Sequence, residues 1–537
     1  MGQTAQTSVG IVRAADVLAE AIAAAGVGHV FGMPGSHSAT VYDAITRLGL
    51  TKTILVRNEQ AGAYAADGYA RATGRPGVVC TTAGPGATNA LSGVAEAWAD
   101  SVPLLLLTGQ VNADRMHVEC GAYHEIDLEA LLRPVTKFCA TVKTPAEVQG
   151  LVAEAFAAMS SGRPRPAALI LPQDVMRAEA VPSLYERPRR PADPSVARIS
   201  DLERAAVLLS RARRPIILAG GGALWSNAAG PLRELAGRLG APVITSLNAK
   251  GLIDERDPFS LGHARSARAR VALPHADAML AVGCRFTEVM TDWRRMPVPR
   301  DLVQIDIDPD QIGMNHPVSV GIVADASAAL AALLPLIPER GRAEWATLRE
   351  QARSARPERP EWLIEALREL LPDESPLFTD ACEMGYRMHT DYPAHRPRTF
   401  FYPSNYIALG WGFPAALGAS VALGPDVPVV SVSGDGGFVM TAQELATAAR
   451  YELRLVAVVH NDSAYGAIKN IQKRDHGGLY REVDLNNPDF IKLADAYGVP
   501  AVRAAGPEAF RDALRDALSR AGPSLIEVPD VWRSIRA

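Results

Sequence analysis

Short apolar runs alternate with longer, alanine-rich amphipathic stretches along almost the whole chain. Continuous runs of β-branched residues and leucine bounded by glycine or proline are typical of buried parallel strands, and the stretches between them are typical of crossover helices. The repeated β–α units predict an α/β fold of three doubly wound parallel-sheet domains. The runs expected to be strands include 77–82, 103–107, 167–171, 215–219, 278–282, 302–307, 427–431 and 455–459.

Two polar stretches interrupt this alternation. Residues 177–198 are rich in proline, arginine and glutamate, and residues 338–360 in arginine and glutamate. Such composition predicts exposed linkers. The predicted domains are therefore 9–176, 198–337 and 360–532, each of a size that can form its own core.

Composition and charge narrow the function classes. The net charge of -4 and 21% charged residues favour neither a nucleic-acid partner nor a basic membrane surface. The five cysteines include no CxxC pair, so neither a disulfide framework nor a zinc site is predicted. The polar N-terminus lacks a signal-peptide pattern, and no apolar run is long enough to span a bilayer. We therefore expect a soluble, cytoplasmic protein.

The most specific pattern lies in the predicted third domain. A strand, 428–433, runs directly into Gly434-Asp435-Gly436-Gly437, and a second strand, 455–459, ends in His460-Asn461-Asp462-Ser463-Ala464-Tyr465-Gly466. Ligands of parallel sheets bind where strands end at their carboxyl edge, and glycines there let the backbone approach a phosphate. A carboxylate from each strand end would supply the hard oxygen ligands that Mg²⁺ prefers. Gly-Asp-Gly alone is also a common turn, so the tandem arrangement carries the inference.

At these residues the chain resembles the thiamine-diphosphate (ThDP) enzymes of the acetolactate synthase, benzoylformate decarboxylase and pyruvate decarboxylase group. In that group an asparagine completes the metal site after the Gly-Asp-Gly. Asp462, which stands 27 residues after Asp435, takes that position here. The resemblance implies Asp435, Asp462 and the backbone carbonyl of Ala464 as the Mg²⁺ ligands. The aspartate that replaces the usual asparagine adds a negative charge beside the diphosphate.

The resemblance also assigns a role to Glu59, which follows the predicted strand 53–56. In the family this glutamate hydrogen-bonds the cofactor's aminopyrimidine ring and thereby activates the thiazolium carbon. A solvated carboxylate at a helix start is the alternative for this residue taken alone.

Further segments match the family. Residues 31–37 resemble its FGxPG loop, 81–89 its glycine-rich turn, and 404–419 the segment whose bulky side chain, here Leu409, wedges the cofactor into a bent conformation. An ordinary core leucine is the alternative for Leu409. The residues expected to contact the cofactor are Pro34, Thr82, Asn89, Glu383, Met384, Leu409, Gly434, Asp435, Gly436, Gly437, Asp462, Ala464, Tyr465 and Gly466.

The resemblance covers residues from about 9 to about 528 and implies a pyrimidine-binding, a middle and a diphosphate-binding domain. It also implies self-association, as a homodimer or homotetramer. In the family the cofactor lies between the first domain of one subunit and the third domain of another. Glu59 and Asp435 would then meet only across a subunit interface.

The signals for the substrate are mixed. Ser36 matches a substrate-contacting serine of benzoylformate decarboxylases, whereas Gln110 matches a position of the acetolactate synthases. His37 is either a proton donor or a helix cap. His124 is either a group for proton transfer or part of a salt bridge. With Glu59, these four residues form the candidate catalytic set.

The leading hypothesis is a ThDP- and Mg²⁺-dependent enzyme that breaks or forms the carbon–carbon bond next to the carbonyl of a small 2-oxo acid. An acetolactate-synthase-like transferase that condenses two 2-oxo acids is the alternative. The tryptophan of that enzyme's acceptor channel is missing from 465–472. Residues 262–268 are shorter than its flavin-contacting segment, so bound FAD is doubtful. A non-catalytic scaffold with the ThDP fold is the minor alternative.

Overall fold

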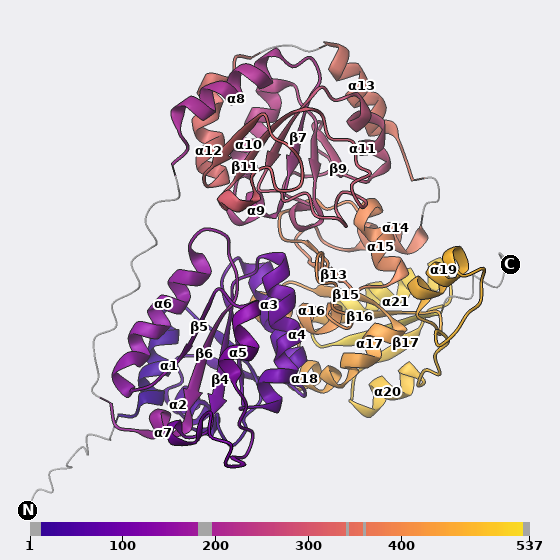
Figure 1. Cartoon of the computed structure of the whole chain (residues 1–537). Helices are drawn as coiled ribbons and strands as arrows, with labels where there is room; N and C mark the ends of the chain where they lie inside the picture. Colours follow the sequence, from indigo (N-terminus) through magenta and orange to yellow (C-terminus); the bar gives the residue numbers. More distant parts are fainter. Residues whose placement is uncertain (1–11, 181–195, 340–342, 358–360, 530–537) are drawn as a thin grey trace, which may run out of the picture. The chain divides into compact units, whose positions relative to one another are not determined.

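The structure is a computed structural model, and it describes residues 12–180, 196–339, 343–357 and 361–529. It contains three six-stranded sheets in which every pair of neighbouring strands is parallel (Figure 1). The predicted α/β fold class with three doubly wound domains is confirmed. Each of the eight apolar runs predicted to be strands overlaps a strand, with ends that differ by at most two residues at the start of the run and one at its end where the run extends past the strand.

The chain divides into two compact units, and the division passes through one helix, α3. The first unit comprises the described residues up to 67 and from 76 to 180, and the second comprises 68–75 and the described residues from 196 onward. The second unit holds both the middle and the C-terminal sheet. No helix among the described residues is long and apolar enough to cross a membrane.

The sheet of the first unit has the strand order β2-β1-β3-β4-β6-β5. Its β4 shows why the prediction from apolar runs succeeds, because all seven of its residues are buried, as in a strand covered by helices on both faces. Its strands are β1 (His29–Gly32), β2 (Lys52–Leu55), β3 (Gly77–Thr81), β4 (Leu104–Gln110), β5 (Phe138–Thr141) and β6 (Ala167–Pro172). Its helices are α1 (Ala14–Ala24), α2 (Ala39–Leu48), α3 (Glu59–Thr73), α4 (Pro85–Asp100), α5 (Leu128–Leu132), α6 (Val148–Ser160) and α7 (Gln173–Arg177).

The middle sheet has the order β12-β11-β10-β7-β8-β9, with one apolar core on each face. Its strands are β7 (Pro215–Ala219), β8 (Val243–Thr245), β9 (Ser260–His263), β10 (Ala278–Val282), β11 (Asp301–Asp306) and β12 (Val320–Val323). Its helices are α8 (Ile199–Arg211), α9 (Gly221–Trp225), α10 (Ala229–Leu239), α11 (Ala267–Ala272), α12 (Ala326–Leu333) and α13 (Ala343–Ser354).

Helix α13 corrects the second predicted linker. Residues 338–360 were expected to be exposed, yet 343–354 are helical, and the fully buried Trp345 donates a hydrogen bond from Nε1 to the carbonyl of Pro215 at 2.7 Å. Trp345 and Ala352 both join a core of the middle sheet, which their seven-residue spacing permits. Most of the first predicted linker, 177–198, lies outside the described residues.

The C-terminal sheet has the order β14-β13-β15-β16-β18-β17. Its strands are β13 (Leu377–Thr379), β14 (Phe400–Phe401), β15 (Val429–Gly434), β16 (Leu455–Asn461), β17 (Ala501–Arg503) and β18 (Ser524–Pro529). Its helices are α14 (Trp362–Leu370), α15 (Glu383–Asp391), α16 (Gly412–Leu423), α17 (Asp435–Thr441), α18 (Leu445–Arg450), α19 (Gly466–Asp475), α20 (Phe490–Ala496) and α21 (Pro507–Ser519).

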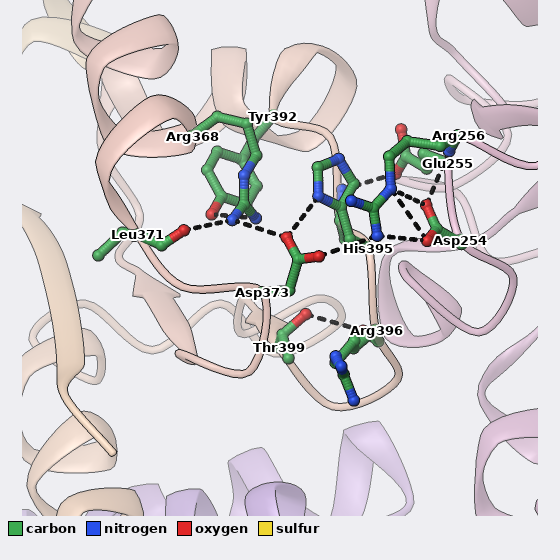
Figure 2. Close-up of polar contacts among 11 residues, drawn as sticks. Asp254, Glu255, Arg256, Arg368, Leu371, Asp373, Tyr392, His395, Arg396 and Thr399 are labelled. Carbon is green, nitrogen blue, oxygen red and sulfur yellow. Dashed lines mark hydrogen bonds and ion pairs between the residues drawn. The ribbon is translucent and has the colours of Figure 1, made fainter. Parts of the chain in front are cut away.

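A polar joint connects the middle and C-terminal sheets (Figure 2). The β8–β9 connection supplies Glu255, which exchanges hydrogen bonds with the backbone of Ala394 at 3.2 Å in each direction. Lys250, whose side chain is fully buried, pairs with Glu255 at 3.0 Å. Beside them, the Asp373 carboxylate contacts Arg256 at 2.9 Å and His395 at 2.8 Å. The Glu255–Ala394 hydrogen bonds and the Arg256–Asp373 ion pair cross between the two sheets, and the buried Lys250–Glu255 pair lies within the β8–β9 connection at this joint.

Candidate active site

The predicted metal-binding residues of the second unit stand at the ends of two neighbouring strands. β15 and β16 pair in register as far as Gly434 and His460, so Asp435 and Asp462 both follow at the carboxyl edge of the sheet. Asp435 is 1% exposed, and Asp462 accepts a hydrogen bond from the backbone N–H of Ala464 at 3.2 Å. Among the described residues, no group of three or more His, Cys, Asp or Glu side chains could hold a metal. Two carboxylates and a carbonyl oxygen remain a suitable donor set for Mg²⁺.

Asn487 is a polar partner of this site that the sequence reasoning missed. Its Nδ2 donates to the Asp435 carboxylate at 2.5 Å and to Oδ1 of Asn461 at 3.0 Å. Asn461 in turn donates to the buried Glu527 at 2.8 Å. This chain of hydrogen bonds fixes the direction in which the Asp435 carboxylate points. The signal in the sequence was its place at the end of the polar segment that follows α19.

Two glycines leave the backbone at this edge bare. A Cβ atom on Gly436 would lie 2.6 Å from the ring of Tyr465 and 3.0 Å from Leu485, so a larger residue would have to displace these side chains. A Cβ atom on Gly437 would lie 3.2 Å from Leu409 Cδ1. The arrangement suits a diphosphate, because backbone N–H groups at a helix start bind anions.

The chain after α19 returns to the metal segment. The N–H of Tyr465 donates to the carbonyl of Val483, and the N–H of Leu485 donates to the carbonyl of Ser463, both at 2.8 Å. At the other side of the site, Glu383 begins α15 and accepts a hydrogen bond from Asn470 of α19 at 3.2 Å. The predicted cofactor residues of the third domain therefore come together; they are Glu383, Met384, Leu409, Gly434, Asp435, Gly436, Gly437, Asp462, Ala464, Tyr465 and Gly466.

The first unit carries its own cluster around Glu59, the first residue of α3. Glu59 is 8% exposed, and its carboxyl group accepts a hydrogen bond from Asn89 at 3.1 Å. A Cβ atom on Gly86 would lie 3.3 Å from Glu59 Oε1. The glycine-rich turn after β3 thus packs directly on this carboxyl group.

The loop after β1 packs on the same turn. The backbone of Gly35 touches Thr82, since a Cβ atom there would lie 2.5 Å from the Thr82 Cβ, and the N–H of His37 donates to Thr82 Oγ1 at 3.4 Å. Ser36 Oγ lies 3.2 Å from His37 Nδ1. Pro34 stands exposed in this loop.

Three rings gather beside the loop. The ring centroids of His37 and His124 lie 5.6 Å apart, those of His37 and Tyr123 lie 5.8 Å apart, and Tyr123 stacks on His124 at 3.7 Å. His124 adopts a left-handed backbone, with φ at +69°. Burial, His124 and Arg177 lower the pKa of His37. The sequence pointed to both histidines but not to the ring of Tyr123, which is 67% exposed.

Gln110 lies at the end of β4 with both ends of its amide occupied. Its Nε2 donates to the carbonyl of Ile126 at 3.0 Å, and its Oε1 accepts from the N–H of Val111 at 2.9 Å. The side chain is fully buried and braces the loop that carries His124. Its place in the candidate catalytic set stays a prediction.

Comparison with known proteins agrees with this geometry. Models of thiamine pyrophosphate enzymes match residues 12–131 (N-terminal TPP binding domain), 202–333 (central domain) and 379–528 (C-terminal TPP binding domain). A probable acetolactate synthase large subunit of Methanocaldococcus jannaschii is 35% identical over 96% of this chain and 92% of its own length. The acetolactate synthase large subunit of Parasynechococcus marenigrum is 34% identical over 96% and 87%. A probable 2-ketoarginine decarboxylase of Pseudomonas aeruginosa is 35% identical over 96% and 93%.

Proposed function

The chain belongs to the thiamine pyrophosphate enzymes, and we propose that it is a ThDP- and Mg²⁺-dependent 2-oxo acid decarboxylase that releases an aldehyde. The observation that carries the choice of reaction is the ring cluster of His37, Tyr123 and His124, which lies against the same glycine-rich turn as Glu59. Loss of CO₂ from a 2-oxo acid must be followed by proton delivery to the remaining carbon if an aldehyde is to leave. Imidazole rings are the side chains best suited to that delivery near neutral pH.

The residues present fit the cofactor. Asp435, Asp462 and the carbonyl of Ala464 would hold Mg²⁺, and the backbone N–H groups of Gly436 and Gly437 would hold the diphosphate. Bound ThDP supplies the stabilisation of negative charge on carbon that protein side chains lack. The protein orients it, and Glu59, fixed by Asn89, would hold a proton beside the pyrimidine ring.

The two histidines divide the proton-transfer task. The lowered pKa of His37 keeps its ring neutral at pH 7, with one proton on either Nδ1 or Nε2. Ser36 Oγ lies 3.2 Å from Nδ1, and its hydroxyl can donate to that nitrogen or accept from it, so it can pair with the ring in either tautomer. The ring centroids of His37 and His124 lie 5.6 Å apart, and His124 is one of the groups that lower the pKa of His37.

A variant series tests this role. In His37→Gln and His124→Gln, CO₂ release in a single turnover is expected to persist, whereas aldehyde release falls by about a hundredfold. Thr88→Ala, on the exposed side of the same glycine-rich segment, serves as the control. Parallel loss of CO₂ and aldehyde would refute proton delivery by these rings.

The names of two relatives favour a second candidate, an acetolactate-synthase-like transferase that joins two 2-oxo acids. The two reactions separate by product. A panel of 2-oxo acids, including pyruvate and a guanidinium-bearing acid, is incubated with ThDP and Mg²⁺, and products are identified by mass. An aldehyde one carbon shorter supports the decarboxylase; a hydroxy-oxo acid supports the transferase; no CO₂ from any acid contradicts both.

A further inference from the structure

Asp380 is a buried carboxylate beside the candidate cofactor site that the proposed function leaves without a role. It follows β13, is 1% exposed, and forms no ion pair within the described part of the chain. Burial raises its pKa to about 6, although three backbone N–H groups act against that rise. A buried carboxyl group without a countercharge is costly, so its retention calls for a reason.

All three N–H groups that it binds are backbone groups. Oδ1 accepts from the adjacent Ala381 at 2.7 Å and from Gly410 at 3.2 Å, and Oδ2 accepts from Gly412 at 3.2 Å. Gly410 and Gly412 are thirty residues away in the sequence, in the segment that leads into α16. Asp380 therefore joins the end of β13 to this segment through both of its oxygens.

The segment 407–412, which we name the wedge loop, has a conformation that needs such support. Ile407 and Gly410 both have left-handed backbones, with φ at +60° and +83°. Thr441 of α17 donates from Oγ1 to the carbonyl of Gly410 at 3.1 Å, so the loop is held on a second side. A Cβ atom on Gly412 would lie 3.0 Å from the Asp380 Cβ, which shows how closely the two segments pack.

The wedge loop carries Leu409 against the glycines of the site. A Cβ atom on Gly437 would lie 3.2 Å from Leu409 Cδ1 and also 3.2 Å from Asp380 Oδ2. Asp380, Leu409 and Gly437 thus meet at one point. We infer that Asp380 is a positioning residue that holds the wedge loop so that Leu409 lies against Gly437, ready to support the bound cofactor. The inference rests on the proposed function for the identity of that cofactor.

A carboxylate does this better than an amide. Both of its oxygens accept hydrogen bonds, whereas asparagine would present an NH₂ group to one of the N–H donors that converge here. Asp380→Asn keeps the size of the side chain and removes an acceptor. Asp426→Asn, an exposed aspartate of the same domain, is the matched control.

The first test uses the protein without cofactor and reads amide hydrogen exchange by mass spectrometry. In Asp380→Asn, exchange across 404–416 is expected to accelerate by about tenfold, because a charge-assisted hydrogen bond to Gly410 or Gly412 is lost. Exchange across β15 and the control variant should match the parent protein. Unchanged exchange across the wedge loop would overturn the inference, whether or not the protein proves to be an enzyme.

The second test asks whether Asp380 acts through Leu409. Asp380→Asn is expected to lower kcat by about tenfold in the parent protein but by less than about twofold in Leu409→Ala, with KM for the 2-oxo acid unchanged. Equal losses in both backgrounds would contradict positioning through Leu409. Should Asp380→Asn fail to fold, Gly412→Ala disturbs the same contact from the loop side and must show the same pattern.

Absence of 2-oxo acid turnover would contradict the proposed function but would leave the hydrogen-exchange result unaffected. In that case, ThDP affinity measured by titration calorimetry with Mg²⁺ replaces kcat in the comparison of Asp380→Asn in the parent protein and in Leu409→Ala. Loss of affinity in Asp380→Asn that persists undiminished in Leu409→Ala would again overturn the inference. The two failures are therefore distinguishable.

Discussion

Replacing Glu255 by glutamine should weaken the joint between the middle and C-terminal sheets. Lys250 is buried, and its ammonium group pairs with the carboxylate of Glu255 at 3.0 Å. The nearest other stabilising group is the ring of Phe400, 5.4 Å from the ammonium nitrogen. Glutamine keeps the size of the side chain and one oxygen for the Ala394 N–H, but it leaves the ammonium group without its charge partner.

Breaking one side of a buried ion pair costs about 3–5 kcal/mol, because an uncompensated charge stays buried. Since the pair lies at the joint between two sheets, we expect the loss to appear as a weakened joint. Urea unfolding followed by far-ultraviolet circular dichroism should then change from one transition for the second unit to two. The control Arg256→Gln breaks contacts of a side chain that is 57% exposed and should cost under about 1 kcal/mol.

A double variant, Lys250→Met with Glu255→Leu, separates charge from packing. Apolar replacement of both partners removes the buried charges together, so it should recover most of the stability lost in Glu255→Gln. A cost below about 1 kcal/mol for Glu255→Gln, or a double variant less stable than the single one, would refute the reasoning.

Three further outcomes are expected. Burial first, then the charges of Arg265 and Lys250, lower the pKa of His389 to about 3, so its ring is neutral in the folded protein. The contribution of His389 to the free energy of unfolding is therefore complete above pH 6.5 and is lost as the pH falls. Between pH 6.5 and 5 this contribution falls by about 2 kcal/mol, and His389→Leu should flatten the pH dependence of urea unfolding; an unchanged slope would contradict it. Gly436→Ala would place a methyl group 2.6 Å from the ring of Tyr465, so the ring must move, and ThDP binding should weaken at least tenfold in calorimetry. Gly522→Ala, where an added Cβ atom meets nothing within 4 Å, is the control for mutation at a glycine of the same domain. Asp462→Asn removes one negative charge and should raise the Mg²⁺ concentration for half-maximal activity by about tenfold; a lower value would show that the aspartate hinders the metal.

The positions of the candidate metal ligands could be predicted because each ligand lies close in sequence to the strand that places it. Asp435 and Asp462 each follow an apolar run directly, and parallel pairing brings the ends of adjacent strands to one edge. Glu59 also lies at the junction of a strand and a helix, but its role comes from the family resemblance, because its position alone fits a solvated carboxylate as well. Local pattern and topology predicted where these residues lie, and their roles stay predictions.

Other residues escaped because their partners lie far away in sequence. Asp380 depends on glycines thirty positions later, and Asn487 reaches Asp435 across 52 residues. Neither contact has a spacing that a single sequence reveals. Helix α13 was missed for a different reason, since its arginines and glutamates dominated the composition and masked the buried Trp345.

The prediction that two subunits share each active site is tested most directly by mixing two inactive variants. Glu59→Gln and Asp435→Asn are each expected to release almost no CO₂ from the preferred 2-oxo acid with ThDP and Mg²⁺. If each active site combines Glu59 of one subunit with Asp435 of another, subunit exchange in an equal mixture creates one intact site in each mixed dimer. The mixture should then recover about a quarter of the parent activity. Activity in either variant alone, or none in a mixture shown by mass spectrometry to contain mixed dimers, would contradict the account.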